Sequence, residues 1–307
     1  LAFHVPTGKV TRIASQDAAQ NGDDVIWVAR DGSARVKLSY QTSIFLGAPG
    51  LWPQVDEVDL DTGKRRVDTP SRTGVSNWYA DGAGVVRMGY GTSEDGRSRR
   101  ILYREKPNTL FRVLDKSRTI DDRLTAPALF LADSTKALVL DDDESGYRAV
   151  YEFDLATLER GKRIFASKGY DIGGLIPDST GFGYMGVSHE EAQARVDWTD
   201  PDMKAMQTTV SGLVKGAQVG ITSLSRDRAR AILEVGGPDA PGGYFIYNRP
   251  ENTLQLLGYS NRAIKMRKMH SVRTIRYKAR DGLEIEAVLT VPVGRKGKLP
   301  LIVMPHG

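Results

Sequence analysis

VIWVARDGSARVKL at residues 25–38 and VDLDTGKRRVD at residues 58–68 are the unit from which most of this chain is built. Each stretch contains two runs in which apolar and polar residues alternate. A turn separates the runs, near Asp31 in the first stretch and at Gly63 in the second. Alternation with a period of two indicates half-buried strands, and a turn between two such runs indicates a β-hairpin. The two stretches together therefore supply four antiparallel strands.

Both kinds of hairpin recur along the chain. The first kind recurs as NWYADGAGVVRMGY (77–90), LFLADSTKALVLDD (129–142), LIPDSTGFGYMGVS (175–188) and ITSLSRDRARAILEV (221–235). The second kind recurs as FHVPTGKVTRI (3–13), LYREKPNTLFRVL (102–114), YEFDLATLERGKRIF (151–165), VDWTDPDMKAMQTTV (196–210) and FIYNRPENTLQLL (245–257). We expect the turns of the first kind at Asp31, Asp81, Asp133, Asp178 and Asp227, and those of the second kind at Gly8, Gly63, Asn108, Gly161, Met203 and Asn252.

The two hairpins alternate with a joint period of about 49 residues. Four antiparallel strands in a repeat of this length are typical of a β-propeller blade. A β-sandwich also has short strands and turns, but not a paired-hairpin period held over five repeats. The hairpin at 3–13 lacks the inner strands of its repeat. We therefore predict an all-β propeller of six or seven blades, not all of them complete here, which ends near Ile264.

Helical patterns are scarce. Residues 187–196, which include SHEEAQAR, are the one stretch that suits a helical turn or two, with a loop as the alternative.

The tail at residues 272–307, VRTIRYKARDGLEIEAVLTVPVGRKGKLPLIVMPHG, begins with another hairpin around Asp281-Gly282. A two-residue loop would pair Arg280 with Leu283 and set a polar side chain against an apolar one. A three-residue loop with Gly282 in a left-handed conformation makes both faces consistent. The expected register pairs Ala279 with Leu283, Lys278 with Glu284, Tyr277 with Ile285 and Arg276 with Glu286.

After this hairpin, residues 292–298 have the composition of a surface loop. Leu299 to Met304 is an unbroken apolar run, which suits a short strand that is buried on both faces. The His306-Gly307 pair that follows Pro305 is, taken alone, an ordinary turn. The predicted domains are a propeller at 1–268 and a separate segment at 269–307.

Composition restricts the class of protein. The 307 residues include no cysteine, which excludes disulfides, thiolate metal sites and a cysteine nucleophile. The net charge of +5 comes from well-mixed charges, and the basic runs near 64–66, 97–100 and 265–268 are short and lie beside turns, so we predict no nucleic-acid partner. No apolar run is long enough for a membrane helix, so we predict a soluble protein without a membrane partner. Because the chain starts at Leu1, a cytoplasmic or periplasmic location is left open.

Candidates for catalysis and metal binding are few. The pattern Gly-x-Ser-x-Gly of α/β-hydrolases is missing, since the stretches around Ser76 and Ser188 lack the last glycine. The four histidines have no metal-ligand spacing, so we predict no metal and no cofactor. The acidic run 141–144 is interpreted as a charged turn rather than a calcium site, and 189–191 as an exposed loop rather than a site for a peptide amine. The tryptophans, expected to pack within or between blades, are Trp27, Trp52, Trp78 and Trp198.

The tail nevertheless resembles a known family. Tyr277-x-Ala279-x-Asp281-Gly282, Leu289-Thr290-x-Pro292 and the run from Leu299 to Gly307 are similar to the entry into the catalytic domain of the prolyl oligopeptidase family, nearest to its acylaminoacyl-peptidase and dipeptidyl-peptidase-like branches. The stretch Tyr147-x-x-Val150-Tyr151-x-x-Asp154-Leu155 in the repeats resembles the same family less specifically.

The resemblance implies a β-propeller followed by the first strands of an α/β-hydrolase domain. It implies serine peptidase chemistry on short peptides or acyl-peptides, with a propeller that restricts access to the active site and a C-terminal hydrolase domain as its partner. His306 and Gly307 correspond to the family's oxyanion-hole turn. None of the catalytic triad is present, so this chain alone is expected to be inactive. The alternatives are a stand-alone propeller that serves as a protein-interaction scaffold and, less in keeping with the sequence, a carbohydrate-acting propeller enzyme.

Overall fold

The computed structural model describes residues 1–14, 17–19, 24–93, 95–117, 119, 122, 124–133, 135–191, 194–214, 216–265, 267 and 269–305. The chain divides into two compact units, Leu1–His189 and Glu190–Gly307, and the boundary falls inside strand β16. Each unit is described by itself. Among the described residues, no helix is long and apolar enough to cross a membrane.

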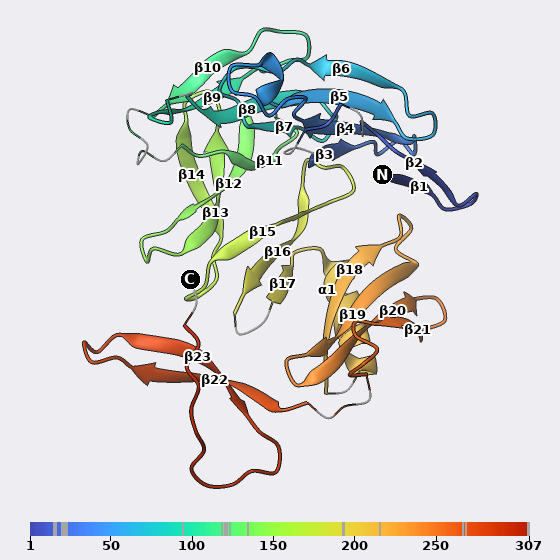
Figure 1. The fold of residues 1–307 in the computed structure, drawn as a ribbon, viewed down its shortest axis with the longest axis vertical. Coiled ribbons are helices and arrows are strands. Elements are labelled where there is room, and N and C mark those ends of the chain that lie inside the picture. Colours follow the sequence, from blue (N-terminus) through green and yellow to red (C-terminus); the bar gives the residue numbers. More distant parts are fainter. Residues whose placement is uncertain are drawn as a thin grey trace. The chain divides into compact units, whose positions relative to one another are not determined.

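The first unit contains three sheets of four antiparallel strands, and in each sheet the strands follow one another in chain order (Figure 1). The strands of these sheets are β3 (Asp24–Val28), β4 (Arg35–Tyr40), β5 (Gln54–Asp59) and β6 (Arg65–Thr69); β7 (Asn77–Ala80), β8 (Val86–Thr92), β9 (Arg99–Tyr103) and β10 (Arg112–Lys116); and β11 (Pro127–Phe130), β12 (Lys136–Asp142), β13 (Arg148–Asp154) and β14 (Glu159–Phe165). A four-stranded antiparallel meander is the blade of a β-propeller. The predicted all-β blade architecture is therefore confirmed.

The same unit has a two-stranded hairpin at its start and a further pair of strands at its end. Strands β1 (Ala2–His4) and β2 (Lys9–Thr11) pair only with each other in the described sheets, as expected for a hairpin without its inner strands. Strands β15 (Ile172–Pro177) and β16 (Tyr184–Glu190) pair antiparallel. A single 3-10 turn, η1 (Pro49–Leu51), lies in the connection between β4 and β5.

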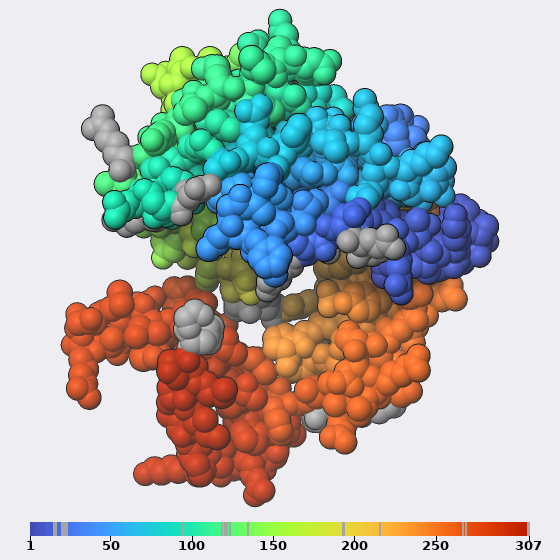
Figure 2. Space-filling model, turned by 45° about the horizontal axis from the view of Figure 1, so that its top comes forward, coloured from blue at the N-terminus to red at the C-terminus, as the bar shows by residue number. Residues whose placement is uncertain are grey.

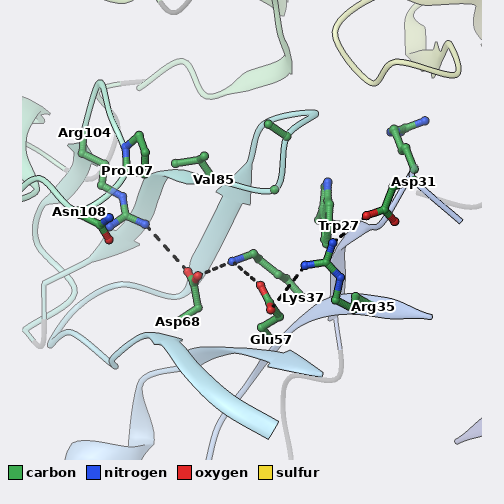
Figure 3. A pocket seen from close by; sticks show the side chains of 13 residues that line it. Trp27, Asp31, Arg35, Lys37, Glu57, Asp68, Val85, Arg104, Pro107 and Asn108 are labelled. Carbon is green, nitrogen blue, oxygen red and sulfur yellow. Dashed lines mark hydrogen bonds and ion pairs between the residues drawn. The ribbon is translucent and has the colours of Figure 1, made fainter. Parts of the chain in front are cut away.

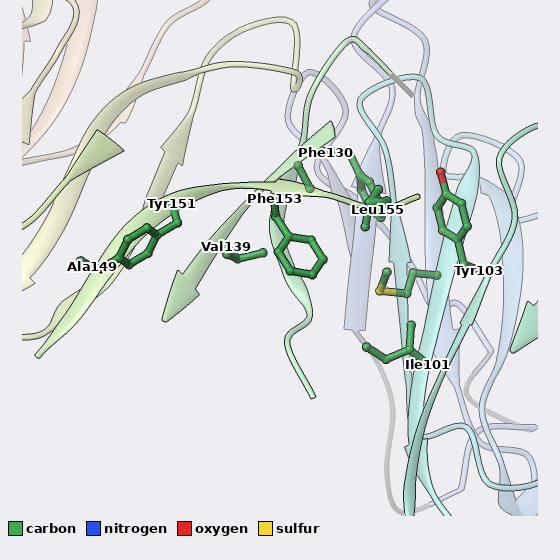
Figure 4. Close-up of a cluster of buried hydrophobic side chains, with 10 residues drawn as sticks. Ile101, Tyr103, Phe130, Val139, Ala149, Tyr151, Phe153 and Leu155 are labelled. Atoms are coloured by element: carbon green, nitrogen blue, oxygen red, sulfur yellow. The ribbon is translucent and has the colours of Figure 1, made fainter. Parts of the chain in front are cut away.

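Neighbouring blades pack face to face through apolar side chains. The cluster in Figure 4 joins Met88, Ile101 and Tyr103 of the second sheet to Val139 and Phe153 of the third. Similar clusters join the first sheet to the second and the third sheet to β15 and β16. In the space-filling view the blue to green segments of this unit form one continuous surface (Figure 2). Burying these side chains is the main driving force that holds the blades together.

The second unit contains one more four-stranded meander. It comprises β17 (Ala194–Trp198), α1 (Pro201–Leu213), then β18 (Gln218–Leu224), β19 (Arg230–Gly237), β20 (Ala240–Asn248) and β21 (Thr253–Tyr259) in one sheet, and finally the hairpin β22 (Ser271–Lys278) and β23 (Glu284–Val291). Met206 and Val210 of α1 pack on Leu233 and Tyr247 of the sheet. Helix α1 therefore covers one face of this meander.

The turns of the inner hairpins are where the sequence predicts them. In each, the aspartate carboxylate accepts a hydrogen bond from the backbone N–H two residues later, at 2.8–3.0 Å; the aspartates are Asp31, Asp81, Asp133, Asp178 and Asp227. An Asp side chain that binds the backbone in this way favours a turn over continued strand. Four of the predicted outer turns are confirmed as well, with positive φ at Gly8, Gly63, Asn108 and Asn252.

The tail hairpin has the predicted register. Tyr277 is paired with Ile285, Lys278 with Glu284 and Arg276 with Glu286. The backbone N–H of Ala279 donates to the carbonyl oxygen of Leu283 over 2.8 Å, and Gly282 has a φ of 90°. A three-residue loop thus closes the hairpin.

Three local predictions are wrong. The predicted outer hairpin at 196–210 is strand β17 followed by helix α1, so Met203 is helical rather than a turn centre. The carboxylate of Asp200 caps this helix and Pro201 occupies its first turn, which overrides the strand pattern before it. The predicted turn at Gly161 lies earlier, at Leu158 with φ 61°, and Gly161 is inside β14. The stretch predicted to allow a helical turn at 187–196 is strand at 187–190 and 194–196.

The predicted buried strand at 299–304 is also wrong. These residues form no strand in the described part of the chain, and the side chains of Leu301, Ile302, Val303 and Met304 are exposed. A strand requires a partner for its backbone groups, and the sheets of the described residues give this segment none.

Candidate functional site

The innermost strands of successive sheets in the first unit border one pocket of about 360 Å³. Strands β3, β7 and β11 are edge strands of their sheets, and all three line it, together with Pro177 at the end of β15 and Gly181 in the turn after it. An edge strand has backbone N–H and C=O groups that no neighbouring strand satisfies. The pocket is therefore surrounded by backbone groups that are able to hydrogen-bond an extended chain.

The side chains in this pocket are mostly apolar with a few polar groups among them. Ile26, Tyr79 and Phe130 supply apolar wall, and Arg30 and Asn77 supply polar groups. Burial raises the pKa of Tyr79, with a further contribution from Tyr90, so its phenol is neutral. The described lining residues include no serine, cysteine, histidine or lysine. The carboxylates in this lining are those of Asp24 and Asp81, and its mostly apolar wall is suited to binding.

Three turns meet at one end of the pocket. The indole N–H of Trp27 donates to the carbonyl oxygen of Gly82 over 3.1 Å. The guanidinium of Arg30 donates to the carbonyl oxygens of Asp178 and Ser179, each over 3.0 Å. The first bond connects β3 to the turn after β7, and the other two connect the turn after β3 to the turn after β15. The entrance at this end is therefore formed by linked backbone segments.

Asp81, which also lines the pocket, has a structural role. Its carboxylate accepts from the backbone N–H groups of Ala83 and Val85, each at 3.0 Å, and lies 3.3 Å from a terminal nitrogen of Arg87. Both members of this ion pair are buried. A buried carboxylate whose oxygens are engaged by these partners is poorly placed to react with a ligand.

The serines with partial hydrolase motifs are part of the blades. Ser76 precedes β7 and its hydroxyl contacts Asn77 and the carbonyl oxygen of Tyr90, while Ser188 lies within β16. Neither follows a strand and opens a helix, which a nucleophile elbow requires. The predicted oxyanion-hole residues His306 and Gly307 lie outside the described residues.

The other predicted candidates are distributed over the chain. The side chains of His4 and His270 bind Thr7 and the N–H of Val293, respectively. His189 is buried in β16, which corrects the exposed loop predicted for 189–191. In the part of the chain that the structure describes, no group of three His, Asp or Glu side chains is placed to hold a metal ion.

The acidic run 141–144 lies at the end of β12 and in the turn after it. Its carboxylates are paired with arginines of β14: Asp141 lies 2.9 Å from Arg160, and Glu144 lies 3.3 Å from Arg163. This arrangement agrees with a charged turn.

The packing role predicted for the tryptophans is clearest for two of them. Trp78 is buried and its indole N–H donates to the carbonyl oxygen of Pro53 over 2.8 Å, which joins the first two sheets. Trp27 joins the same two sheets through Gly82. Sequence reasoning identified both residues but missed Arg30, because its carbonyl partners are about 150 residues away in the chain.

The sheets are meanders, and their inner edge strands share one pocket. This arrangement defines the chain as a β-propeller protein.

No protein-family model matches the chain, and no curated protein matches it. Among solved structures, it is similar to dipeptidyl peptidase 4 from Porphyromonas gingivalis, at 12% identity and a TM-score of 0.45, over 88% of this chain and 42% of that one. It is also similar to a puromycin-hydrolyzing peptidase from Mycobacterium tuberculosis, at 16% identity and a TM-score of 0.47, over 91% of this chain and 45% of that one.

A third similar structure is TolB from Acinetobacter baumannii, at 13% identity and a TM-score of 0.39, over 84% of this chain and 61% of that one. The chain spans less than half the length of the two peptidases. The fold is therefore defined by the strand order within the sheets of this chain.

Proposed function

We propose that this chain is the substrate-gating propeller of a serine oligopeptidase, which admits short peptides or acyl-peptides to a hydrolase domain. In this proposal residues 1–268 are the propeller, and 269–307 are the first strands of the α/β-hydrolase domain. His306 and Gly307 form its oxyanion-hole turn. The catalytic triad belongs to sequence after Gly307.

The observation that carries the proposal is the pocket between the edge strands β3, β7 and β11. Its unsatisfied backbone groups suit an extended peptide, because strand addition uses main-chain hydrogen bonds that do not depend on sequence. Its volume of about 360 Å³ corresponds to a ligand of a few residues at most. The entrance formed by the turns at Arg30, Gly82 and Gly181 would exclude folded proteins.

The tail supports the second half of the proposal. The hairpin β22–β23 and its turn contain the residues Tyr277, Ala279, Asp281 and Gly282 of the family resemblance, in the predicted register. After it, Ile302 and Met304 are 83% and 82% exposed, in a run of neighbouring apolar side chains. Contiguous exposed apolar residues mark a surface that another part of a protein covers. In this proposal the hydrolase domain covers these apolar side chains.

The experiment uses the 307-residue chain and a longer chain that includes the sequence encoded after Gly307. We expect a serine-reactive fluorophosphonate to label the longer chain only, and the longer chain to hydrolyse short peptides but not folded proteins. An extended protein with an intact Ser-His-Asp triad that cleaves no short peptide would contradict the proposal. A gene without a hydrolase domain downstream would instead favour the interaction scaffold.

Gating itself is tested by narrowing the pocket. Ala128 in β11 lines it and is exposed, so Ala128→Trp places a large side chain in the channel without entering the core. In the longer chain we expect Ala128→Trp to lower kcat/KM for peptides relative to the unsubstituted protein, and to lower it more for longer peptides. The kcat/KM for a small acyl ester should stay the same. Ala156→Trp, at an exposed position in the outer turn after β13, is the matched control. Equal kinetics for both variants would show that peptides do not pass through this pocket.

A further inference from the structure

A second pocket of about 380 Å³ in the first unit is lined by charged side chains (Figure 3). Its walls come from the strands β3 to β6 and from the second sheet, at 83–85, at Arg104 and at 107–108. It differs in composition and in most of its residues from the pocket between β3, β7 and β11, which we call the central pocket. The gating proposal does not use it.

The strand register places three pocket residues in one row. Trp27 in β3 is paired with Lys37 in β4, and Lys37 is paired with Glu57 in β5. Side chains of directly paired residues lie on the same face of a sheet. Lys37 is almost completely buried, with its side chain 6% exposed. Its ammonium group contacts the carboxylate of Asp68 and lies 3.6 Å from that of Glu57.

The carboxylates of the pocket already have cationic partners. Asp68 is bound by Lys37, and Asp31 lies 2.8 Å from Arg35. Glu57 has Lys37, Arg35 and Arg66 within 3.6–3.9 Å. A pocket whose anions are neutralised in this way has little attraction for a cationic ligand.

Arg104 is the cation with spare donors. Its side chain is 12% exposed, and its Nε donates to the carbonyl oxygen of Val86 over 2.6 Å. One terminal nitrogen lies 3.9 Å from Asp68, which is beyond hydrogen-bond distance, and the guanidinium carbon lies 4.6 Å from the ring centre of Phe111. Burial lowers the pKa of Arg104, because desolvation disfavours its charged form. The terminal N–H groups therefore lack an acceptor among the described residues.

The balance of charges points to an anion. Four cationic residues line the pocket, Arg30, Arg35, Lys37 and Arg104, against three carboxylates, Asp31, Glu57 and Asp68, which leaves one positive charge in excess. Among the described residues, Arg30 is hydrogen-bonded to neutral carbonyl groups only. Asn108 lines the same side as Arg104 and its amide makes no hydrogen bond with any described residue. A monoanion that accepts from both groups would neutralise the excess.

We propose that this pocket binds a carboxylate, held by the terminal N–H groups of Arg104 and the side-chain amide of Asn108. The planar guanidinium matches the two oxygens of a carboxylate. A single excess charge suits a carboxylate better than phosphate, whose charge approaches −2 near neutral pH. Trp27, Val85 and Pro107 supply apolar surface for the rest of the ligand. The carboxylate comes from a peptide C-terminus or from a small organic acid.

The test is a calorimetric titration of the 307-residue protein with N-acetyl-leucine and, separately, with N-acetyl-leucinamide, Ala-Ala-Leu, acetate and inorganic phosphate. We expect N-acetyl-leucine to bind at least about tenfold more tightly than its amide, since a charge-assisted bidentate contact is lost. Tighter binding of Ala-Ala-Leu than of N-acetyl-leucine indicates a peptide C-terminus, and the reverse order indicates a small acid. Equal binding of the acid and its amide, or phosphate binding more tightly than any carboxylate, overturns the proposal.

Two variants locate the binding. Arg104→Lys retains the charge but removes the planar fork, and we expect at least about tenfold weaker carboxylate binding. Asn108→Gly removes the amide at a position whose φ of 61° glycine adopts freely, so the turn is retained and binding weakens severalfold. Arg97→Gln, at an exposed loop position outside the pocket, is the control and leaves binding unchanged. If Arg104→Lys does not fold, the affinity of Asn108→Gly for N-acetyl-leucine decides whether the carboxylate binds in this pocket. An unchanged affinity in Asn108→Gly overturns the proposed site.

Discussion

The indole N–H of Trp27 donates a hydrogen bond to the carbonyl oxygen of Gly82 over 3.1 Å, and this bond joins the first blade to the second at the entrance of the central pocket. The two residues are 55 positions apart in the chain, close to the repeat period of about 49. The bond therefore connects strand β3 of one repeat to the turn after β7 in the next, and a propeller depends on such contacts between blades.

Replacing Trp27 by phenylalanine removes this bond and leaves a half-buried carbonyl group without its donor. We expect Trp27→Phe to lower the free energy of unfolding by about 1 kcal/mol, the net value of one neutral hydrogen bond. Trp52→Phe is the matched control, because Trp52 is also partly buried but its indole donates no hydrogen bond to the described residues. Thermal unfolding followed by circular dichroism measures both. An equal loss in the two variants would mean that ring volume, and not the bond, matters at Trp27.

Gly84 lies directly against the ring of Trp27. A Cβ at this position would come within 2.7 Å of the indole, and the φ of Gly84 is 81°. Gly84→Ala thus combines an unfavourable backbone conformation with overpacking. Gly96→Ala has the first penalty alone, since its φ is 70° and no atom lies within 4 Å of the added Cβ. We expect Gly96→Ala to cost about 1–2 kcal/mol and Gly84→Ala about 1–3 kcal/mol more. Equal losses in denaturant titrations would contradict close packing at Trp27.

The turn at Asp81 differs from the other inner hairpin turns because its aspartate forms a buried ion pair with Arg87. Asp81→Asn retains an oxygen for the backbone N–H groups of the turn but removes the carboxylate charge that lies 3.3 Å from the guanidinium of Arg87, a residue that is 4% exposed. We expect a loss of about 3–5 kcal/mol, as is usual for breaking one side of a buried ion pair. The loss should be visible in the midpoint of urea unfolding.

Asp133→Asn is the matched control for this change. Asp133 occupies the same turn position in the third sheet, is exposed and accepts the same kind of hydrogen bond from Thr135. We expect a loss of about 0.5 kcal/mol or less there, as for most exposed substitutions. Similar losses in both variants would indicate that the turn, and not the ion pair, accounts for the stability at Asp81.

Local sequence was sufficient for the strands and turns, because their determinants are close in the chain. The register of Tyr277 with Ile285 depends only on alternation and on Gly282, and the inner turns depend on one aspartate each. Contacts such as Arg30 with Asp178 depend on how blades pack against one another, which no local pattern specifies. For the run from Leu299 to Met304, the sequence indicates burial but does not identify the partner that would cover these side chains.

Helix α1 was missed although its signals are present. Asp200 and Pro201 are a capping residue and a first-turn proline, and Met203, Met206 and Val210 have the spacing of one helix face. The residues of β17 directly before them alternate, and continuing this alternation through Pro201 predicts a hairpin in place of the helix.

The first turn of this helix should respond to acid. The two terminal nitrogens of Arg249 bind Asp202 at 2.5 and 3.0 Å, and a terminal nitrogen of Arg228 binds it at 3.1 Å. These hydrogen bonds, first from Arg249 and then from Arg228, lower the pKa of Asp202 from its ordinary 3.8 to about 2. The folded protein therefore binds fewer protons at Asp202 than the unfolded chain does between pH 4 and pH 2. The contribution of Asp202 to stability is present above about pH 4 and is lost as the pH falls toward 2.

We expect Asp202→Asn to lower the melting temperature at pH 6. We also expect the decline of the melting temperature between pH 4 and pH 2 to be shallower in this variant than in the unsubstituted protein. Asp239→Asn, at an exposed position whose side chain binds none of the described residues, should leave both the melting temperature and its pH dependence unchanged. Melting curves of the three proteins recorded from pH 6 to pH 2 make the comparison, and parallel curves for Asp202→Asn and the unsubstituted protein would rule out a role for this carboxylate in acid stability.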